Sequence, residues 1–460
     1  MFLKPKKKVF VIGLDCAPPK LLFEEFKEYL PNLGMLIDNG LSCRMRSIHP
    51  PITIPAWMSM CSGNDAGQIG VYGFRTRVGN SYTQFDISTS LKFSRIEKIW
   101  DVLARHKKKS ILVGIPPTYP VYPIDGCMIS GFICPDAQRD FTYPKELKSE
   151  IEKLVGEYLF DVVFRTEDRD QLLNNAWEMT NKRFKVIEYL LKNKKWDFFM
   201  FVEIGVDRIQ HAFWKYYDRT HRLYEPSHKH KDTILNYYKL IDEKVGRILS
   251  CLDKDTTVFV VSDHGAKAMK GSFCINEWLI KKGYLVLNKY PERIEQFDKL
   301  DINWKKTKVW GWGGYYGRIF INRKGREDEG IVEDDEYEQL RDKIISQLQE
   351  EVDQFGNKWD TKVYKPEQLY KTLNGDTCDL MAYFDDLAYR SAGTVGHNSL
   401  FLNKNDTGPD DAMHDWEGVF VKYDPRDRKK IQSDALSLLD FKSQVLKAMG
   451  IDSGSPPAGR

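Results

Sequence analysis

The feature that most constrains this chain of 460 residues is a series of short apolar segments separated by helical patterns. Apolar side chains dominate residues 8–15, 196–204 and 256–262, without the alternation of a half-exposed strand. Such continuous runs are typical of strands whose two faces are both covered. Helical spacing at 172–194 and 235–252 places helices between these strands. The alternation predicts an α/β fold, an α/β/α sandwich with a mainly parallel central sheet.

The predicted strands and helices divide the chain into one large domain and an inserted subdomain. Further strands are predicted at 110–116, 126–133, 379–384 and 417–422. The segment 285–370 is richer in glycine, aromatic and charged residues, and it contains a polar helix over 336–352, so we expect an inserted α+β subdomain there. The main domain would comprise 1–284 and 371–450. Residues 451–460 are predicted to be a disordered tail because small residues and proline dominate them.

Composition excludes several classes of protein. The 69 basic residues nearly balance the 66 acidic ones, which argues against a nucleic-acid polymer as partner. No apolar stretch reaches the length of a membrane span, so none is predicted. The basic start of the chain lacks an apolar export region, and the 8 cysteines form no CxxC pair. We therefore expect a reduced, cytoplasmic protein.

Acidic and histidine side chains stand where three of the apolar strands end. Asp15 closes VFVIGLD, Asp207 and His211 follow FFMFVEIG, and Asp263 and His264 close TVFVVSDHG. Ligands of open parallel sheets bind beyond the carboxyl ends of the strands. The spacing of Asp207 and His211 puts both on one face of a helical turn. Because carboxylates and imidazoles suit divalent metals, the sequence predicts a metal site at this edge.

A hydroxyl group completes the predicted chemistry. Thr53 lies in PPITIPAW, ahead of an apparent helix that has Pro55 in its first turn and Gly63 at its end. A helix N-terminus favours a phosphate, and coordination by a metal can turn a threonine hydroxyl into a nucleophile. The alternative role of Thr53 is a simple helix cap. Two cations about 3.5–4 Å apart would stabilise both oxygens of an in-line displacement at phosphorus.

Five segments resemble the alkaline phosphatase superfamily: GLDCAPP, PPITIPAWMSMCSG, VDRIQHAFW, VSDHG and MHDWEGVFV. Within it they are most similar to the type I phosphodiesterase/nucleotide pyrophosphatase family, in an intracellular branch. The resemblance implies two metal ions, with zinc as the usual metal and manganese in some branches. One ion would be held by Asp15, Thr53, Asp263 and His264, and the other by Asp207, His211 and His414.

The resemblance also implies a mechanism. Thr53 would attack phosphorus as a metal-bound alkoxide, and water would then hydrolyse the resulting phosphothreonine. The family's final histidine shortly precedes a strand such as EGVF, which favours His414 over His397. His397 would then support the site, contact substrate or serve the structure. Cys16 replaces a glycine usual in the family, and Phe74 lies near the place of an asparagine found in extracellular nucleotide pyrophosphatases.

We predict a metal-dependent phosphohydrolase that acts on a small-molecule phosphate ester, a diester rather than a monoester. Trp312 is expected to stack on the substrate and Arg318 to pair with an anionic group, although aromatic residues at this density also form plain packed cores. One alternative is a phosphomonoesterase or phosphomutase on the same scaffold. The other is a metal-bearing scaffold protein without catalysis. The sequence indicates neither the leaving group nor the oligomeric state.

Overall fold

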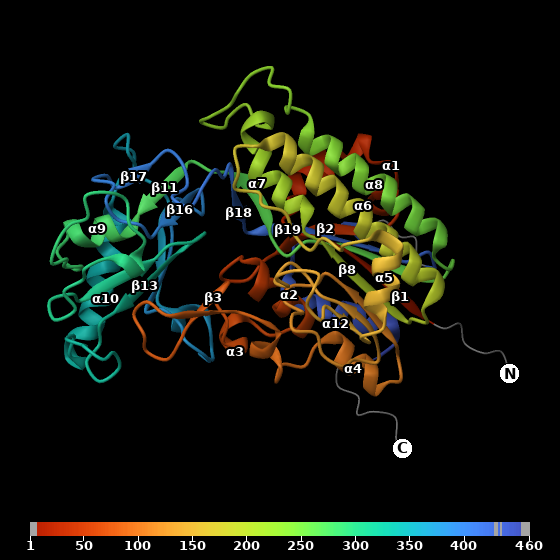
Figure 1. Cartoon of the computed structure of the whole chain (residues 1–460), viewed down its shortest axis with the longest axis horizontal. Helices are drawn as coiled ribbons and strands as arrows, with labels where there is room; N and C mark the ends of the chain where they lie inside the picture. Colours follow the sequence, from red (N-terminus) through yellow and green to blue (C-terminus); the bar gives the residue numbers. More distant parts are fainter. Residues whose placement is uncertain (1–6, 427–430, 433–434, 452–460) are drawn as a thin grey trace.

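The computed structural model of the chain describes residues 7–426, 431–432 and 435–451. A ten-stranded sheet forms the centre of the larger lobe, with helices on both of its faces (Figure 1). In spatial order its strands are β20 (Ile431–Gln432), β2 (Leu41–Arg46), β19 (Glu417–Tyr423), β9 (Thr256–Val261), β1 (Lys8–Leu14), β8 (Phe198–Glu203), β5 (Ser110–Val113), β6 (Gly126–Ile129) and β7 (Thr142–Tyr143), and β21 (Leu436–Ser437) pairs with β2.

The central strands are parallel and end level with one another. β1 pairs in parallel with β8 and β9, and β5 pairs in parallel with β8 and β6. Leu14 is the register partner of Glu203, and Gly13 is that of Val261. The residues that follow β1, β8 and β9 therefore meet at one edge of the sheet, as the sequence predicts.

Alternate residues of β1 face two separate hydrophobic cores. Val9 and Val11 belong to one core, whereas Phe10, Ile12 and Leu14 belong to the other. The first core is covered by α2 (Thr53–Ser62), α4 (Ile99–Arg105) and α12 (Phe441–Met449). The second is covered by α1 (Pro31–Asp38), α5 (Leu147–Val155), α6 (Arg169–Asn193), α7 (Gly205–Tyr217) and α8 (Thr233–Cys251). The predicted α/β/α sandwich is confirmed.

A second, smaller lobe lies beside the sheet edge and contains two further sheets (Figure 1). One consists of β16 (Tyr389–Ala392), β11 (Gly271–Cys274) and β17 (Phe401–Leu402). The other consists of β12 (Val309–Trp312), β13 (Gly317–Ile321), β15 (Leu380–Tyr383) and β14 (Lys362–Tyr364). Its helices include α9 (Ile275–Lys281) and α10 (Asp334–Glu350).

The strand predicted at 379–384 exists as β15, Leu380–Tyr383. β15 pairs with β13 and β14 in the second lobe, because an apolar run specifies burial and not the partner strand. The second lobe thus has elements from Gly271 to Leu402, beyond the predicted 285–370. The division into domains at 1–284 and 371–450 stays a prediction. The predicted tail, 451–460, lies outside the described residues except for Ile451.

Two pairs of short strands complete the fold. β10 (Gly265–Ala268) and β18 (Ala412–Asp415) form an antiparallel pair at the junction, and β3 (Arg75–Arg77) pairs with β4 (Phe85–Ile87) in a hairpin. Among the described residues, no helix is both long and apolar enough to cross a bilayer.

Candidate metal centre and active site

Asp15 is held by the packing of α2 against β1. The indole Nε1 of Trp57 donates a hydrogen bond of 2.6 Å to Oδ2 of Asp15. A Cβ at Gly13 would lie 2.8 Å from the Trp57 ring, so glycine permits the close approach that this bond needs. Oδ1 of Asp15 is buried and has no hydrogen-bond partner among the described residues. It is therefore available to a ligand.

Asp263 and His264 follow the end of β9. The backbone N–H of Cys16 donates to Oδ1 of Asp263 over 3.2 Å, and Oδ2 of Asp263 is buried without a partner. Nε2 of His264 lies 3.2 Å from that Oδ2 and 3.9 Å from Oδ1 of Asp15. The other ring nitrogen, Nδ1, lies 3.1 Å from the carbonyl of Gly265. This contact requires a proton on Nδ1 and leaves the Nε2 lone pair free.

Cys16 has a φ of 65°, in the left-handed region that favours glycine. This conformation explains the glycine usual at the position, and it aims the Cys16 N–H at Asp263. The side chain is fully buried, as expected of a small residue packed beneath the site.

Asp207 and His211 lie one turn apart on α7, as their spacing predicts. Oδ2 of Asp207 accepts a hydrogen bond of 2.6 Å from Arg208, while Oδ1 is buried without a hydrogen bond. Nε2 of His211 lies 3.2 Å from that Oδ1. Nδ1 of His211 lies 2.7 Å from Oδ1 of Asp410, which holds the ring in place. Oδ1 of Asp207 and Nε2 of His211 thus face each other, and Nε2 also lies 3.5 Å from the Tyr315 hydroxyl.

His414 reaches the site from β18. Its Nδ1 donates to the carbonyl of Pro51 over 2.7 Å, so Nε2 has the lone pair. Nε2 lies 3.9 Å from Oδ1 of Asp207. The imidazole of His414 stacks on that of His264, with 3.8 Å between ring centroids. The structure thereby brings together two histidines from distant segments, His264 after β9 and His414 on β18.

Thr53 lies beside His264 at this group. α2 begins at Thr53 itself, one residue earlier than the apparent helix start, and ends at Gly63, whose φ is 74°. The N-cap is Ile52, and no side chain caps the helix, so the alternative role of Thr53 as a cap is not observed. Its hydroxyl instead lies 3.4 Å from Nε2 of His264.

All seven residues predicted as metal ligands or nucleophile lie together and are buried. Three groups of donor atoms are each compact enough to hold one ion, with all atoms within 4.8 Å of one another: Asp15, Asp263 and His264; Asp207, His264 and His414; Cys16, Asp207 and His211. One oxygen of each aspartate lacks a partner, and such groups are costly in a protein interior. The donor set therefore fits divalent cations.

The burial and close approach of these carboxylates and imidazoles also shift their pKa values. Burial, followed by repulsion from Asp207, raises the pKa of Asp15 well above its usual value. Burial, followed by repulsion from Asp15, does the same to Asp263. Burial also opposes ionisation of Asp207, but the charges of His211 and Arg208 outweigh it and hold that pKa well below its usual value. Burial lowers the pKa of His264 to about 4, so its imidazole is neutral at neutral pH. Three clustered carboxylates thus repel one another unless cations lie between them.

A cavity of about 440 Å³ opens beside Thr53, Asp207 and His414. Trp312 and Arg318, the predicted substrate contacts, both line it, as does Phe74. His397 does not: its Nε2 lies 2.8 Å from the hydroxyl of Thr394, and its N–H donates to Glu277. Among the described residues, only His414 of the two rival histidines reaches the metal centre.

Asp410 and Arg165 are parts of the site that were not predicted from the sequence, whereas Tyr315 was predicted as part of an aromatic wall of the pocket and lines the cavity. Asp410 binds His211, and the Tyr315 ring stacks on His414 with centroids 4.0 Å apart. Arg165 donates to both Asp410 and Tyr315. One signal was present: Asp410 belongs to the acidic segment NDTGPDDAMHD just before His414.

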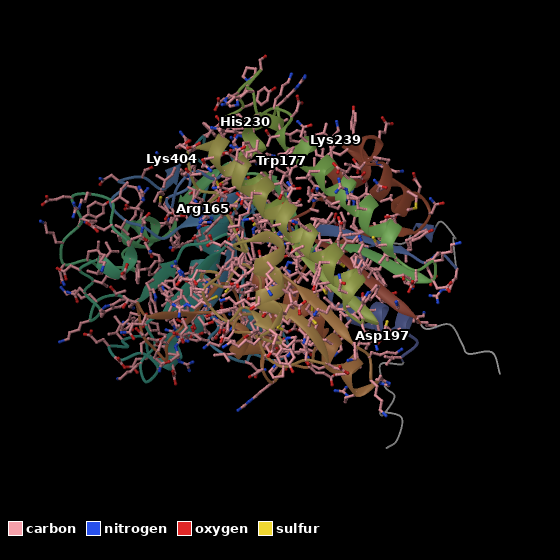
Figure 2. The ribbon with its side chains drawn as sticks, turned by 45° about the vertical axis from the view of Figure 1, so that its right-hand side comes forward. Arg165, Trp177, Asp197, His230, Lys239 and Lys404 are labelled. Atoms are coloured by element: carbon pink, nitrogen blue, oxygen red, sulfur yellow. The ribbon has the colours of Figure 1, made fainter. Side chains whose placement is uncertain are left out.

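The site lies where the two lobes meet. In Figure 2, Arg165 stands at the junction with the second lobe, whereas Asp197, just before β8, stands at the opposite end of the sheet. This placement agrees with the rule that parallel sheets bind ligands beyond the carboxyl ends of their strands.

Comparisons with known proteins agree with this architecture. The family of type I phosphodiesterases/nucleotide pyrophosphatases matches residues 9–416. A search of curated proteins found no match. An inactive variant of murine ectonucleotide pyrophosphatase/phosphodiesterase 5 in complex with AMP is similar in fold, with a TM-score of 0.57 and 14% identity over 99% of this chain and 97% of that one. The human protein gives a TM-score of 0.57 and 14% identity over 98% and 97%. Because the family match covers most of its length, the chain belongs to the type I phosphodiesterase/nucleotide pyrophosphatase family, whose members hydrolyse phosphoric ester bonds.

Proposed function

We propose that the chain hydrolyses small-molecule phosphodiesters with Thr53 as nucleophile, at a centre built for two divalent cations. One observation carries the proposal. Three aspartates each present a buried oxygen without a hydrogen bond, and three imidazole nitrogens point to the same space beside the Thr53 hydroxyl. The two sets of ligands are Asp15, Thr53, Asp263 and His264, and Asp207, His211 and His414.

When bound, the cations would neutralise the phosphoryl oxygens and lower the pKa of a hydroxyl or water. The chain's own residues hold the reacting groups. Thr53 starts α2, whose unpaired N–H groups and dipole favour a phosphate there. The contacts of His264 with Gly265 and of His414 with Pro51 fix both rings.

Two displacements then complete the reaction. Oγ1 of Thr53 loses its proton and bonds to phosphorus while the bond from phosphorus to the leaving oxygen breaks. A water molecule then attacks the phosphothreonine and restores the threonine hydroxyl. Each step depends on positioning and charge neutralisation more than on further covalent chemistry.

Zinc is our first choice of metal, because three imidazoles and three carboxylates suit it, and manganese is the second. The substrate class is broader than nucleotides. The murine relative was solved with AMP, which makes nucleotides candidates. Phe74, however, lines the cavity near the position at which extracellular nucleotide pyrophosphatases carry an asparagine.

The test is turnover of bis-p-nitrophenyl phosphate and p-nitrophenyl phosphate by protein loaded with Zn²⁺ or Mn²⁺, beside Thr53→Ala. Thr220→Ala, at an exposed position that is none of the predicted ligands, is the matched control. We expect metal-dependent hydrolysis that favours the diester, is lost in Thr53→Ala and persists in Thr220→Ala. Full activity in Thr53→Ala, or activity without metal, would contradict the mechanism. A preference for the monoester would favour the phosphomonoesterase alternative.

A further inference from the structure

Arg390, on β16 of the second lobe, is a buried cation with unused hydrogen-bond donors. Arg390 is 8% exposed, and within the described part of the chain its buried Nε and Nη1 have no hydrogen-bond partner. It lines the same cavity as Thr53. Because a guanidinium group has five donors, leaving two of them unpaired in the interior is costly unless a ligand accepts them.

The nearest carboxylate does not satisfy these donors. Oδ1 of Asp406 lies 3.9 Å from Nε of Arg390, beyond hydrogen-bond distance. Oδ2 of Asp406 accepts instead from the N–H groups of Gly393 and Thr394 and from the Thr394 hydroxyl. Asp406 therefore holds the turn after β16 and leaves Arg390 with free N–H groups.

A second guanidinium lies close by. Arg165, from the main lobe, has its Cζ 5.9 Å from the centroid of the Tyr315 ring, and Arg390 has its Cζ 4.8 Å from the same centroid. Burial, and then the charge of Arg165, lowers the pKa of Arg390. Arg165 already pairs with Asp410 over 3.1 Å. Nε and Nη1 of Arg390 have no such partner among the described residues, so an anion bound beside Arg390 would offset the remaining repulsion between the two guanidinium groups.

Tyr315 contacts both of these cations and also two of the proposed metal ligands. Its ring stacks on His414 at 4.0 Å, and its hydroxyl lies 3.5 Å from Nε2 of His211. His264 stacks on His414, His414 stacks on Tyr315, and the Arg390 guanidinium contacts the Tyr315 ring. Tyr315 thus connects Arg390 to the proposed ligand His414.

We propose that Arg390 and Arg165 form a subsite for a second anionic group, a phosphate or carboxylate carried by the substrate a few bonds from the reacting phosphorus. The inference rests on the proposed function and narrows its substrate class. The bidentate geometry of a guanidinium matches both kinds of oxyanion, and the contact is stronger than one to a neutral group. The substrates are then phosphodiesters with a further negative charge.

The test uses four p-nitrophenyl phosphodiesters whose second ester group is ethyl, 2-methoxyethyl, 2-carboxyethyl or 2-phosphoethyl, with the metal-loaded full-length protein. We expect kcat/KM for at least one anionic ester to exceed that of the ethyl ester by about tenfold or more, because a charge-assisted hydrogen bond is gained. The anionic ester with the higher kcat/KM identifies which anion the subsite prefers. Equal values for all four, or an equal rise for the methoxyethyl ester, would overturn the proposal.

Variants assign the effect to Arg390. In Arg390→Gln the ratio of anionic to ethyl ester kcat/KM should fall by about tenfold, and Arg390→Lys should keep part of it because the charge remains. Arg247→Gln, at an exposed residue of α8 paired with Glu243, should leave the ratio unchanged. A ratio that persists in Arg390→Gln would contradict the assignment. The wild-type comparison stands even if Arg390→Gln does not fold.

A binding measurement separates this inference from the proposed function. Calorimetric titration compares ethane-1,2-diol bisphosphate with ethyl phosphate, neither of which has to be hydrolysed. Tighter binding of the bisphosphate, reduced in Arg390→Gln, supports the subsite. Equal binding contradicts it. If no ester is hydrolysed, the proposed function fails, yet this titration still decides the subsite.

Discussion

Nδ1 of His211 lies 2.7 Å from Oδ1 of Asp410, and both side chains are fully buried. Burial opposes ionisation of Asp410, but the charges of His211 and Arg165 outweigh it and lower the pKa of Asp410 to about 2. An ionised Asp410 accepts the Nδ1 proton and directs the Nε2 lone pair of His211 at the metal centre. Outer partners of this kind fix the orientation of a ligand and raise its basicity.

Asp410→Asn should therefore weaken metal binding by about 10–100-fold, the effect typical of such partners. Competition with a chromophoric chelator measures the affinity for Zn²⁺. Asp415→Asn is the control, since Asp415 pairs with Lys267 and its carboxylate belongs to none of the donor groups. Equal affinities in wild type and Asp410→Asn would show that Asp410 does not position His211.

The backbone at Cys16 gives a second prediction. Cys16→Gly should retain activity, since glycine adopts a φ of 65° without strain and keeps the N–H bond to Asp263. Cys16→Val should lower the free energy of unfolding by about 1–3 kcal/mol, because a branched side chain is strained in this region. Urea unfolding of the three metal-loaded proteins measures the difference. A valine variant as stable as wild type would refute the strain argument.

The two rival histidines make a third prediction. His414→Gln should reduce kcat/KM by roughly 100-fold or more, because a metal ion that supplies several kcal/mol of transition-state stabilisation loses a ligand. His397→Gln should stay within a few fold, since His397 contacts Thr394 and not the metal centre. Steady-state kinetics with bis-p-nitrophenyl phosphate give both values. The reverse order would make His397 the ligand.

Metal binding should strengthen as the pH rises. Burial, and then repulsion from neighbouring aspartates, raises the pKa values of Asp15 and Asp263 well above their usual range in the metal-free protein, so protons compete with a cation for these carboxyl groups. Fewer protons compete at higher pH, and binding releases protons. The stabilisation by a fixed concentration of Zn²⁺, measured as a shift in Tm, should be larger at about pH 7.5 than at about pH 5.5. A shift that does not change with pH would mean that the carboxylates do not bind the metal.

The sequence predicted the main sheet and the clustering of three aspartates, the proposed metal ligands, for one physical reason. β1, β8 and β9 are continuous apolar strands, so their parallel pairing follows, and parallel strands bring Asp15, Asp207 and Asp263 to one edge. His414 could be predicted only through the family resemblance, because it lies on β18, outside the main sheet. The cytoplasmic location and the choice of zinc stay predictions.

The strand pairing of the second lobe and the two arginines Arg165 and Arg390 of the cavity wall could not be predicted in the same way. β15 has the apolar pattern of any buried strand, and no local feature of its sequence indicates that it pairs with β13 and β14. Arg165 and Arg390 lie far apart in sequence and meet only because the two lobes pack together. An isolated arginine carries no periodic signal, so its role depends on contacts that only the folded chain makes.

The stereochemical course at phosphorus tests the role of Thr53 most directly. A chiral phosphorothioate diester is hydrolysed in ¹⁸O water by the metal-loaded protein, and the configuration of the product is determined. Two successive in-line displacements, through the Thr53 hydroxyl and then water, predict retention of configuration. Inversion would show a single attack by water and would contradict a covalent intermediate on Thr53.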